Sequence, residues 1–258
     1  MSFEPARLHE DLARIPEEVW TEHFNQNDYQ GRWSSVSLRS LSGRSNDISA
    51  PGAEADAFRE TPLMEQCPYL QAVVRTFEFP LRAVRLLRLQ AGSRVREHID
   101  ADLGLAGGEL RIHVPMATND QLEFVVANRQ LKLREGEAWY VDFSQPHRIH
   151  NGGETDRVHL VIDGQVNDWA LALLERSAKE IVTETCEPRG IAEFRAFRER
   201  VYEDAELQSN LEPILHTPEL LQAVVDAGQA RGYNFGLDEV ESVYRENRRE
   251  WKARVVPL

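Results

Sequence analysis

Short runs of alternating or β-branched residues, separated by Gly, Asn, Asp and Pro, fill the chain from Trp33 to Asp163. Their length and their period of two are typical of β-strands. The runs are WSSVSL, AVRLLRLQAG, ELRIHVPM, LEFVVAN, LKLREGEAWYVDF and RVHLVID. Many short strands with turns at this spacing predict a mainly β fold of the sandwich or barrel kind. A helix over LMEQCPYLQAVVRTF, interrupted near Pro68, is expected to buttress the sheet.

The pattern changes after Asp163 from strands to helices. Four segments carry apolar residues at helical spacing: NDWALALLERSAKEIVTE, IAEFRAFRERVYED, TPELLQAVVDAGQARGY and LDEVESVYRENRREWKAR. We therefore expect a β-domain over residues 1–165 and a helical C-terminal region over residues 166–258. The first of the four helices could also pack back onto the sheet.

Charge and cysteine content exclude several classes of protein. The net charge of −13 over 258 residues, with no run of Lys or Arg, argues against nucleic acid as a partner. No apolar stretch reaches the roughly 20 residues that cross a bilayer, and the N-terminus has acidic residues where a secretory signal has an apolar core. We expect a cytoplasmic protein without a membrane partner, in which Cys67 and Cys186 are free thiols.

Five of the eight histidines lie between His98 and His159, inside the predicted β-region. In VREHID the strand period of two places His98 and Asp100 on one face, and His147 after Pro146 is the best candidate for a third ligand. Two histidines and one carboxylate form the facial triad that holds non-haem Fe(II) and leaves positions open. Zinc hydrolysis is less well supported because no HExxH helix is present. The alternative is that His98 and Asp100 form a surface hydrogen-bonded pair.

The strand period of two also predicts that basic side chains point toward the cavity of the candidate metal site. Arg111 and His113 share one face of ELRIHVPM, and Arg157 and His159 share one face of RVHLVID. The neighbours expected to face the opposite way, into apolar packing, are Ile112, Val158 and Leu160.

A buried guanidinium requires an anion. Without a counter-charge it costs several kcal/mol, whereas a dicarboxylate held by two parallel hydrogen bonds offsets that cost. The distal carboxylate of 2-oxoglutarate is such an anion, and its 2-oxo acid end could chelate iron. The alternative is that Arg157 pairs with Asp156 or Glu154 at the strand edge.

These residues carry a resemblance to a known family. The stretch RLLRLQAGSRVREHIDADLG…LRIHVPM…GEAWYVDFSQPHRIHNGGETDRVHLVID, with the earlier WTEHFNQNDYQGRWSSVSL, resembles the aspartyl/asparaginyl β-hydroxylases, which are Fe(II)/2-oxoglutarate dioxygenases. The resemblance covers residues 20–165 and implies a double-stranded β-helix, a cupin-like jelly roll. Its most specific part is the spacing from His147 to Arg157. In the family a metal-binding His is followed ten residues later by the Arg that binds the carboxylate of 2-oxoglutarate, usually with an Asn shortly after the His, which is Asn151 here.

The resemblance implies roles for the remaining site residues. Iron would be bound by His98, Asp100 and His147, and 2-oxoglutarate by Arg157, His113 and perhaps Arg111, with His159 and Asn151 as possible pocket residues. Asp100 is absent from the animal hydroxylase but retained in the bacterial branch that includes the cis-proline hydroxylases, so aspartyl specificity is not implied.

The implied reaction is hydroxylation of an amino-acid side chain, free or within a peptide, with O₂ as oxidant and succinate and CO₂ as coproducts. The alternative function is a non-catalytic cupin-like binding module.

A second resemblance concerns the helical tail. FRAFRERVYEDAELQSNL…ELLQAVVDAGQARGYNF…DEVE is similar to the nitrogen-fixation-associated leader-peptide family. This likeness implies a contact with a peptide or protein through the C-terminal helices. The other interpretation is a helical bundle that packs on the barrel.

Overall fold

The structure is a computed structural model that describes residues 1–49, 53–100, 103–178, 187–214 and 217–254. The chain divides into two compact units, one formed by Met1–Val126 with Leu131–Glu184 and the other by Ala127–Gln130 with Thr185–Leu258. Each unit is described by itself. The division lies after Glu184, whereas the sequence placed a boundary at residues 165 and 166.

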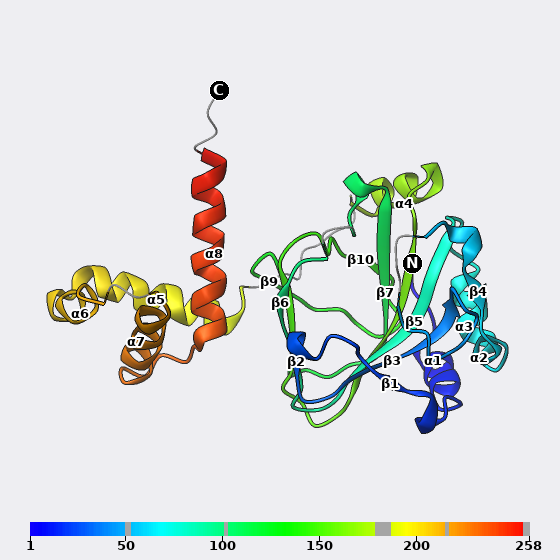
Figure 1. The fold of residues 1–258 in the computed structure, drawn as a ribbon, viewed down its shortest axis with the longest axis horizontal. Coiled ribbons are helices and arrows are strands. Elements are labelled where there is room, and N and C mark those ends of the chain that lie inside the picture. The colour runs from blue at the N-terminus through cyan, green and yellow to red at the C-terminus, as the bar shows by residue number, and fades with distance from the viewer. Residues whose placement is uncertain (50–52, 101–102, 179–186, 215–216, 255–258) are drawn as a thin grey trace. The chain divides into compact units, whose positions relative to one another are not determined.

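The first unit is built from two antiparallel sheets (Figure 1). The first sheet has the strand order β1 (Thr21–Glu22), β3 (Trp33–Ser40), β5 (Leu81–Leu89), β12 (Arg157–Gln165), β7 (Glu109–Ala117) and β10 (Trp139–Tyr140), with β4 (Arg59–Glu60) paired to β3. The second sheet has the order β2 (Tyr29–Gln30), β6 (Arg94–His98), β11 (His147–Asn151), β8 (Leu122–Val126) and β9 (Arg129–Leu131). Of β9, only Leu131 is assigned to the first unit.

The chain passes back and forth between the two sheets. From β5 onward, β6, β8, β9 and β11 belong to the second sheet, whereas β5, β7, β10 and β12 belong to the first. Every pairing within the described strands is antiparallel. This alternation is the topology of a double-stranded β-helix and confirms the predicted mainly β jelly roll.

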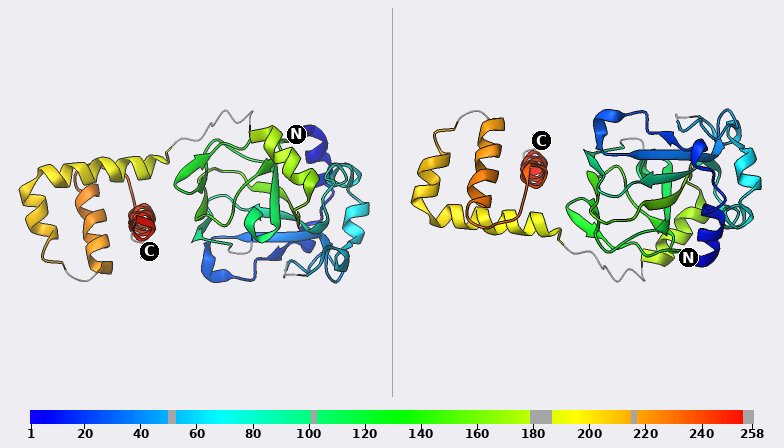
Figure 2. Two further views of the ribbon diagram at one scale, coloured as in Figure 1. Left: turned by 90° about the horizontal axis from the view of Figure 1, so that it is seen from above. Right: turned by 90° about the horizontal axis from the view of Figure 1, so that it is seen from below.

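Helices cover the outer face of the first sheet (Figures 1 and 2). They are α1 (Pro5–Leu12), α2 (Pro62–Glu65), α3 (Pro68–Val74) and α4 (Asp168–Ala178). Short 3₁₀ turns occur at Glu17–Val19, Gln26–Asp28, Ala55–Ala57 and Leu105–Gly107. The predicted helix interrupted near Pro68 is confirmed as the pair α2 and α3. Ala170 of α4 is buried in the same outer core, so this helix packs back onto the sheet.

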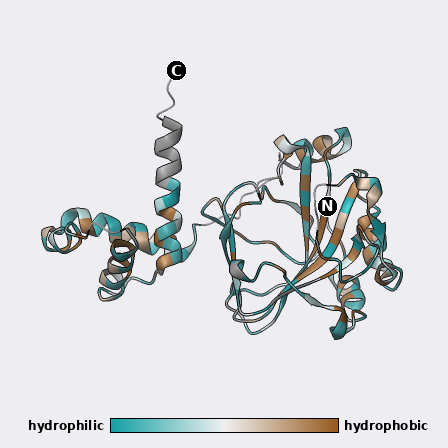
Figure 3. Cartoon of the chain, in the orientation of Figure 1, coloured by the Kyte–Doolittle hydropathy of each residue, from teal (hydrophilic) through white to brown (hydrophobic). Residues whose placement is uncertain are grey.

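The two faces of the first sheet bury different residues. Ile112, Val158 and Leu160 lie in the outer core against the helices, as predicted from the strand period. Figure 3 shows the apolar residues concentrated along the strands of this unit. The inner core between the sheets contains Leu87, Leu89, Val95, Phe124, Phe143, Ile149 and Val161, drawn from both sheets. On β12, Arg157, His159 and Asp163 alternate with the outer-core residues and share the parity of Val161, so their side chains face this inner space.

The second unit is helical. Its helices are α5 (Arg189–Glu203), α6 (Ala205–Leu211), α7 (Thr217–Gln229) and α8 (Leu237–Arg254), and they confirm the predicted helical C-terminal region. They share an apolar core of their own that includes Phe197, Leu207 and Phe235. The resemblance of this unit to the leader-peptide family stays a prediction.

Two further expectations from composition concern cysteine and the membrane. Cys67 is a free, fully buried thiol, and burial raises its pKa to about 11. Cys186 lies outside the described residues. Among the helices that the structure describes, none combines the length and the apolar character that crossing a bilayer requires.

Candidate metal centre

The three predicted metal ligands converge. In the pairing of β11 with β6, His147 lies directly opposite His98, and the two rings are 4.2 Å apart between centroids. Asp100 follows the end of β6, where its backbone N–H donates to the carbonyl oxygen of Phe143. One ligand atom from each of His98, Asp100 and His147 lies within 4.8 Å of the others. The fold thus brings the third ligand to the pair that the sequence placed on one face.

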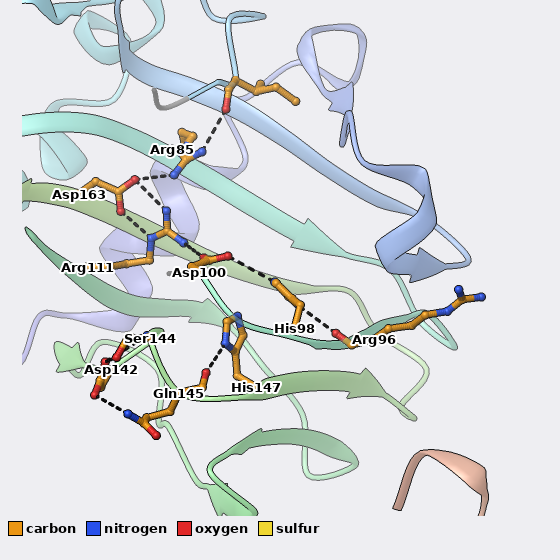
Figure 4. A network of polar contacts seen from close by, with 11 residues as sticks. Arg85, Arg96, His98, Asp100, Arg111, Asp142, Ser144, Gln145, His147 and Asp163 are labelled. Atoms are coloured by element: carbon orange, nitrogen blue, oxygen red, sulfur yellow. Dashed lines mark hydrogen bonds and ion pairs between the residues drawn. The ribbon is translucent and has the colours of Figure 1, made fainter. Parts of the chain in front are cut away.

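Both imidazoles present the same nitrogen to the centre. Nδ1 of His98 donates to the carbonyl oxygen of Arg96 at 2.8 Å, and Nδ1 of His147 donates to that of Gln145 at 3.0 Å (Figure 4). Because a carbonyl oxygen only accepts, both Nδ1 atoms carry the proton and both Nε2 atoms keep a free lone pair. Histidines that ligate metals are commonly held in this way by their second nitrogen.

Protonation and donor set both fit a divalent cation. Burial, followed by the neighbouring His98, lowers the pKa of His147 to about 4, so its imidazole is neutral at pH 7. The Nε2 atom of His98 lies 3.7 Å from Oδ1 of Asp100, which therefore faces the histidines. Two imidazoles and one carboxylate, all on one side, suit Fe(II) in a facial triad with open positions.

Deeper between the sheets, Arg157 is buried, and none of the described residues provides a counter-ion for it. It is 1% exposed, its Nη2 donates to Nδ1 of His159 at 2.8 Å, and its guanidinium lies 5.6 Å from the ring of Phe124. No carboxylate contacts it among the described residues, and Asp156 instead accepts from the backbone of Ala91. Burial alone lowers the pKa of Arg157 to about 9. The alternative pairing with Asp156 or Glu154 is therefore not found.

Arg157 also sets the protonation of its neighbours. Since a guanidinium only donates, Nδ1 of His159 is an acceptor, and Nδ1 of His113, 3.0 Å from it, must donate to the same atom. Nε of Arg157 and Nε2 of both histidines are buried and have no partner in the described part of the chain. Unsatisfied polar atoms of this kind cost free energy, and a polar ligand would remove that cost.

A cavity of about 670 Å³ opens beside His98 and Asp100, two of the three candidate metal ligands. One wall is aromatic: the ring of His23 stacks on Trp33 at 3.7 Å, with Phe24 on its other side at 4.5 Å. Another part of the lining is charged and includes Arg85, Arg111 and Asp163, together with His98 and Asp100. The cavity is large enough for a substrate next to the metal.

Arg111 has partners that the sequence did not indicate. Its Nε and Nη2 donate to the two oxygens of Asp163, at 2.6 and 3.0 Å, and its Nη1 donates to Oδ2 of Asp100 at 2.9 Å (Figure 4). Burial alone lowers the pKa of Arg111, but the charges of Asp163 and Asp100 raise it above its ordinary value. A contact of Arg111 with 2-oxoglutarate stays a prediction.

Sequence reasoning missed Asp163 and Arg85. Both were detectable, because Asp163 shares the parity of Arg157 and His159 along β12, and Arg85 shares that of the inward Leu87 and Leu89 along β5.

Asn151 supports a loop. It is fully buried, its amide donates to the carbonyl oxygens of Leu89 and Thr155, and Oδ1 accepts from Asn119 and from the backbone of Gly153. These bonds fix the connection between β11 and β12, and hence where Arg157 begins its strand. Asn151 is not among the residues that line the cavity.

The buried histidines predict a dependence of stability on pH. Burial and then the charge of Arg157 lower the pKa of both His113 and His159 well below 6.5. Below pH 6.5 the unfolded chain therefore binds protons that the folded chain does not, and stability falls. Each histidine contributes up to about 1.4 kcal/mol per pH unit. Urea denaturation from pH 7.5 to 5 should show this loss, and the His159→Asn variant should show a shallower slope. An unchanged slope would contradict the assignment.

Comparison with known proteins places the chain in a family. The family model described as aspartyl/asparaginyl beta-hydroxylase matches residues 4–166. An L-proline cis-4-hydroxylase of Rhizobium meliloti (strain 1021) is 27% identical over 187 residues, which cover 71% of this chain and 65% of that protein. The chain thus spans slightly less than two thirds of this relative.

Solved structures are also similar. A 2OG-Fe(II) oxygenase-family oxidoreductase from Burkholderia pseudomallei has a TM-score of 0.42 at 16% identity, covering 63% of this chain and 79% of its own. The cupin domain of Schizosaccharomyces pombe Cnp3 has a TM-score of 0.27 at 12% identity, covering 40% and 66%. Because the family model covers more than half of the sequence, the chain belongs to the aspartyl/asparaginyl β-hydroxylase family.

Proposed function

We propose that the protein is an Fe(II)- and 2-oxoglutarate-dependent dioxygenase that hydroxylates an amino-acid side chain, free or within a peptide. The observation that carries the proposal is the convergence of His98, Asp100 and His147 within 4.8 Å, with both histidines locked through Nδ1. Family membership and the relative named as a proline hydroxylase support it.

The residues of this chain have distinct tasks in the proposed reaction. His98, Asp100 and His147 would hold the iron. The buried guanidinium of Arg157 would bind the distal carboxylate of 2-oxoglutarate, with His113 beside it, and the anion would supply the missing counter-charge. When bound, iron, 2-oxoglutarate and O₂ supply the oxidising chemistry, with succinate and CO₂ as coproducts.

The protein itself would position the metal ligands and the substrate and exclude water from the reactive centre. The sheet pairing fixes the ligands, and the inner core around Phe124 and Phe143 surrounds the cosubstrate residues. The substrate would lie in the cavity between the aromatic wall at Trp33 and the charged wall at Asp163. A reactive centre is thereby kept close to one substrate carbon and away from bulk solvent.

The test begins without oxygen. Fe(II) and 2-oxoglutarate added anaerobically to the full chain should produce a weak visible charge-transfer band. On admission of O₂, free amino acids and peptides are screened for a mass gain of one oxygen with matching succinate. Absence of both the band and succinate would contradict the proposal.

The alternative, a non-catalytic cupin-like binding module, predicts a different outcome from the same experiment. Such a module could bind the metal or an organic anion at Arg157, but it would release no succinate with any substrate. A zinc hydrolase would instead remain active under anaerobic conditions. The three functions are therefore separated by one set of measurements.

A further inference from the structure

Asp163 joins two buried guanidinium groups near the end of β12. It is 4% exposed, and its carboxylate accepts three hydrogen bonds from two arginines (Figure 4). Nε and Nη2 of Arg111 lie 2.6 and 3.0 Å from Oδ1 and Oδ2, and Nη2 of Arg85 lies 2.5 Å from Oδ2. The second amino group of Arg85, Nη1, donates to the carbonyl oxygen of Ile48 at 3.0 Å. Both oxygens of Asp163 thus accept hydrogen bonds from arginine.

Charge pairing explains why this carboxylate stays ionised. Burial by itself raises the pKa of Asp163, but the charges and hydrogen bonds of Arg111 and Arg85 lower it below its ordinary value. A bidentate arginine–carboxylate pair also fixes orientation, because the planar fork of the guanidinium matches the two oxygens. Asp163 therefore fixes the plane in which the guanidinium of Arg111 lies.

The orientation of this plane determines which N–H groups of Arg111 can donate to Asp100. Asp163 occupies the forked edge formed by Nε and Nη2, and on the other side of the guanidinium Nη1 donates to Oδ2 of Asp100 at 2.9 Å. Oδ1 of Asp100 faces the histidines instead, 3.7 Å from Nε2 of His98. One oxygen of the carboxylate is neutralised by the arginine, and the other is left for a cation.

We propose that Asp163 is a positioning residue for the metal ligand Asp100, acting through Arg111. By occupying the Nε–Nη2 edge of Arg111, Asp163 prevents that edge of the guanidinium from binding both oxygens of Asp100 and competing with the metal. The inference rests on the proposed function, in which Asp100 is a ligand. Partners of metal ligands commonly orient them, and loss of such a partner weakens metal affinity by roughly 10- to 100-fold.

The test is a titration of the full chain with Co(II), followed by calorimetry and by the visible d–d absorption of the bound ion. The Asp163→Asn variant is expected to bind Co(II) about 10- to 100-fold more weakly than the natural chain, with altered absorption. Wild-type affinity and absorption in a folded Asp163→Asn variant would overturn the proposal. Failure of the natural chain to bind Co(II) would instead contradict the proposed function.

A matched control separates positioning from general destabilisation. Asp11 is also a buried carboxylate, 1% exposed, and it accepts from the backbone N–H groups of Tyr69 and Leu70 at the start of α3. The Asp11→Asn variant should lower the thermal midpoint and leave the Co(II) affinity unchanged. A purely structural role for Asp163 would give its variant the same behaviour.

A double variant tests the competition itself and restores the balance of charge. Asp163→Asn with Arg111→Met removes the arginine that would otherwise bind both oxygens of Asp100. We expect it to recover at least part of the Co(II) affinity lost in Asp163→Asn. If the Asp163→Asn variant does not fold, the double variant is measured in its place. It should bind Co(II) within about tenfold of the natural chain. A larger loss in the double variant would overturn the competition.

Discussion

Replacing Arg157 with Met is expected to stabilise the ligand-free protein and to weaken the binding of 2-oxoglutarate strongly. Arg157 is 1% exposed and lacks a carboxylate partner among the described residues, so its charge opposes folding. Exchange of buried charge for an apolar side chain of similar length commonly raises the free energy of unfolding by about 1–4 kcal/mol. Loss of one partner of a buried charge pair weakens binding by about 2–5 kcal/mol, or roughly 30- to 5000-fold.

Urea denaturation with and without saturating 2-oxoglutarate and Mn(II) measures both effects, because a ligand that binds only the folded state raises its stability. The control is Arg88→Met, since Arg88 on β5 is also buried but is paired with Glu17 through two contacts of 2.6 Å. That variant should be less stable than the natural chain and should bind 2-oxoglutarate normally. Destabilisation of Arg157→Met, or unchanged binding by it, would contradict the expectation.

The second large effect is expected at the metal centre. The His147→Ala variant removes one of the three ligands and should lower the affinity for Fe(II) or Co(II) by more than the roughly 100-fold that loss of an outer partner costs. Turnover should fall with it. Calorimetric titration with Co(II), and Fe(II)-dependent succinate formation, measure the two losses separately.

His150→Ala is the matched control for His147→Ala. His150 lies on the same strand, β11, but opposite Glu123 and Arg94, and it does not belong to the cluster of ligand atoms. Its variant should keep both metal affinity and turnover. A His147→Ala variant that binds Co(II) within about tenfold of the natural chain would exclude His147 as a ligand.

Much of the fold could be read from local pattern. The strand period of two fixes which residues share a face, so Ile112, Val158 and Leu160 could be assigned to the outer core. The same rule placed Arg157 and His159 together on the inner face. The helices of the second unit followed from apolar spacing over more than ten residues, which is the most reliable local signal.

The domain boundary was less accessible to this reasoning. Periodicity marks where strands give way to helices, and that change occurs at β12. The structural division lies later, after Glu184, because α4 buries Ala170 against the outer core of the sheet. The unit to which an amphipathic helix belongs depends on the surface against which it packs. The apolar spacing predicts the helix but does not identify that surface.

The sequence by itself predicted the strands, the inward parity of the charged residues, and three residues, His98, Asp100 and His147, of the two types that suit Fe(II). Only the tertiary structure decided that His147 lies opposite His98, that Arg157 has no acidic partner in the described part of the chain, and that Asp163 holds Arg111. The physical reason is that these contacts join strands far apart along the chain. Pairing register and the charge of a buried neighbour both depend on which strands become adjacent in space.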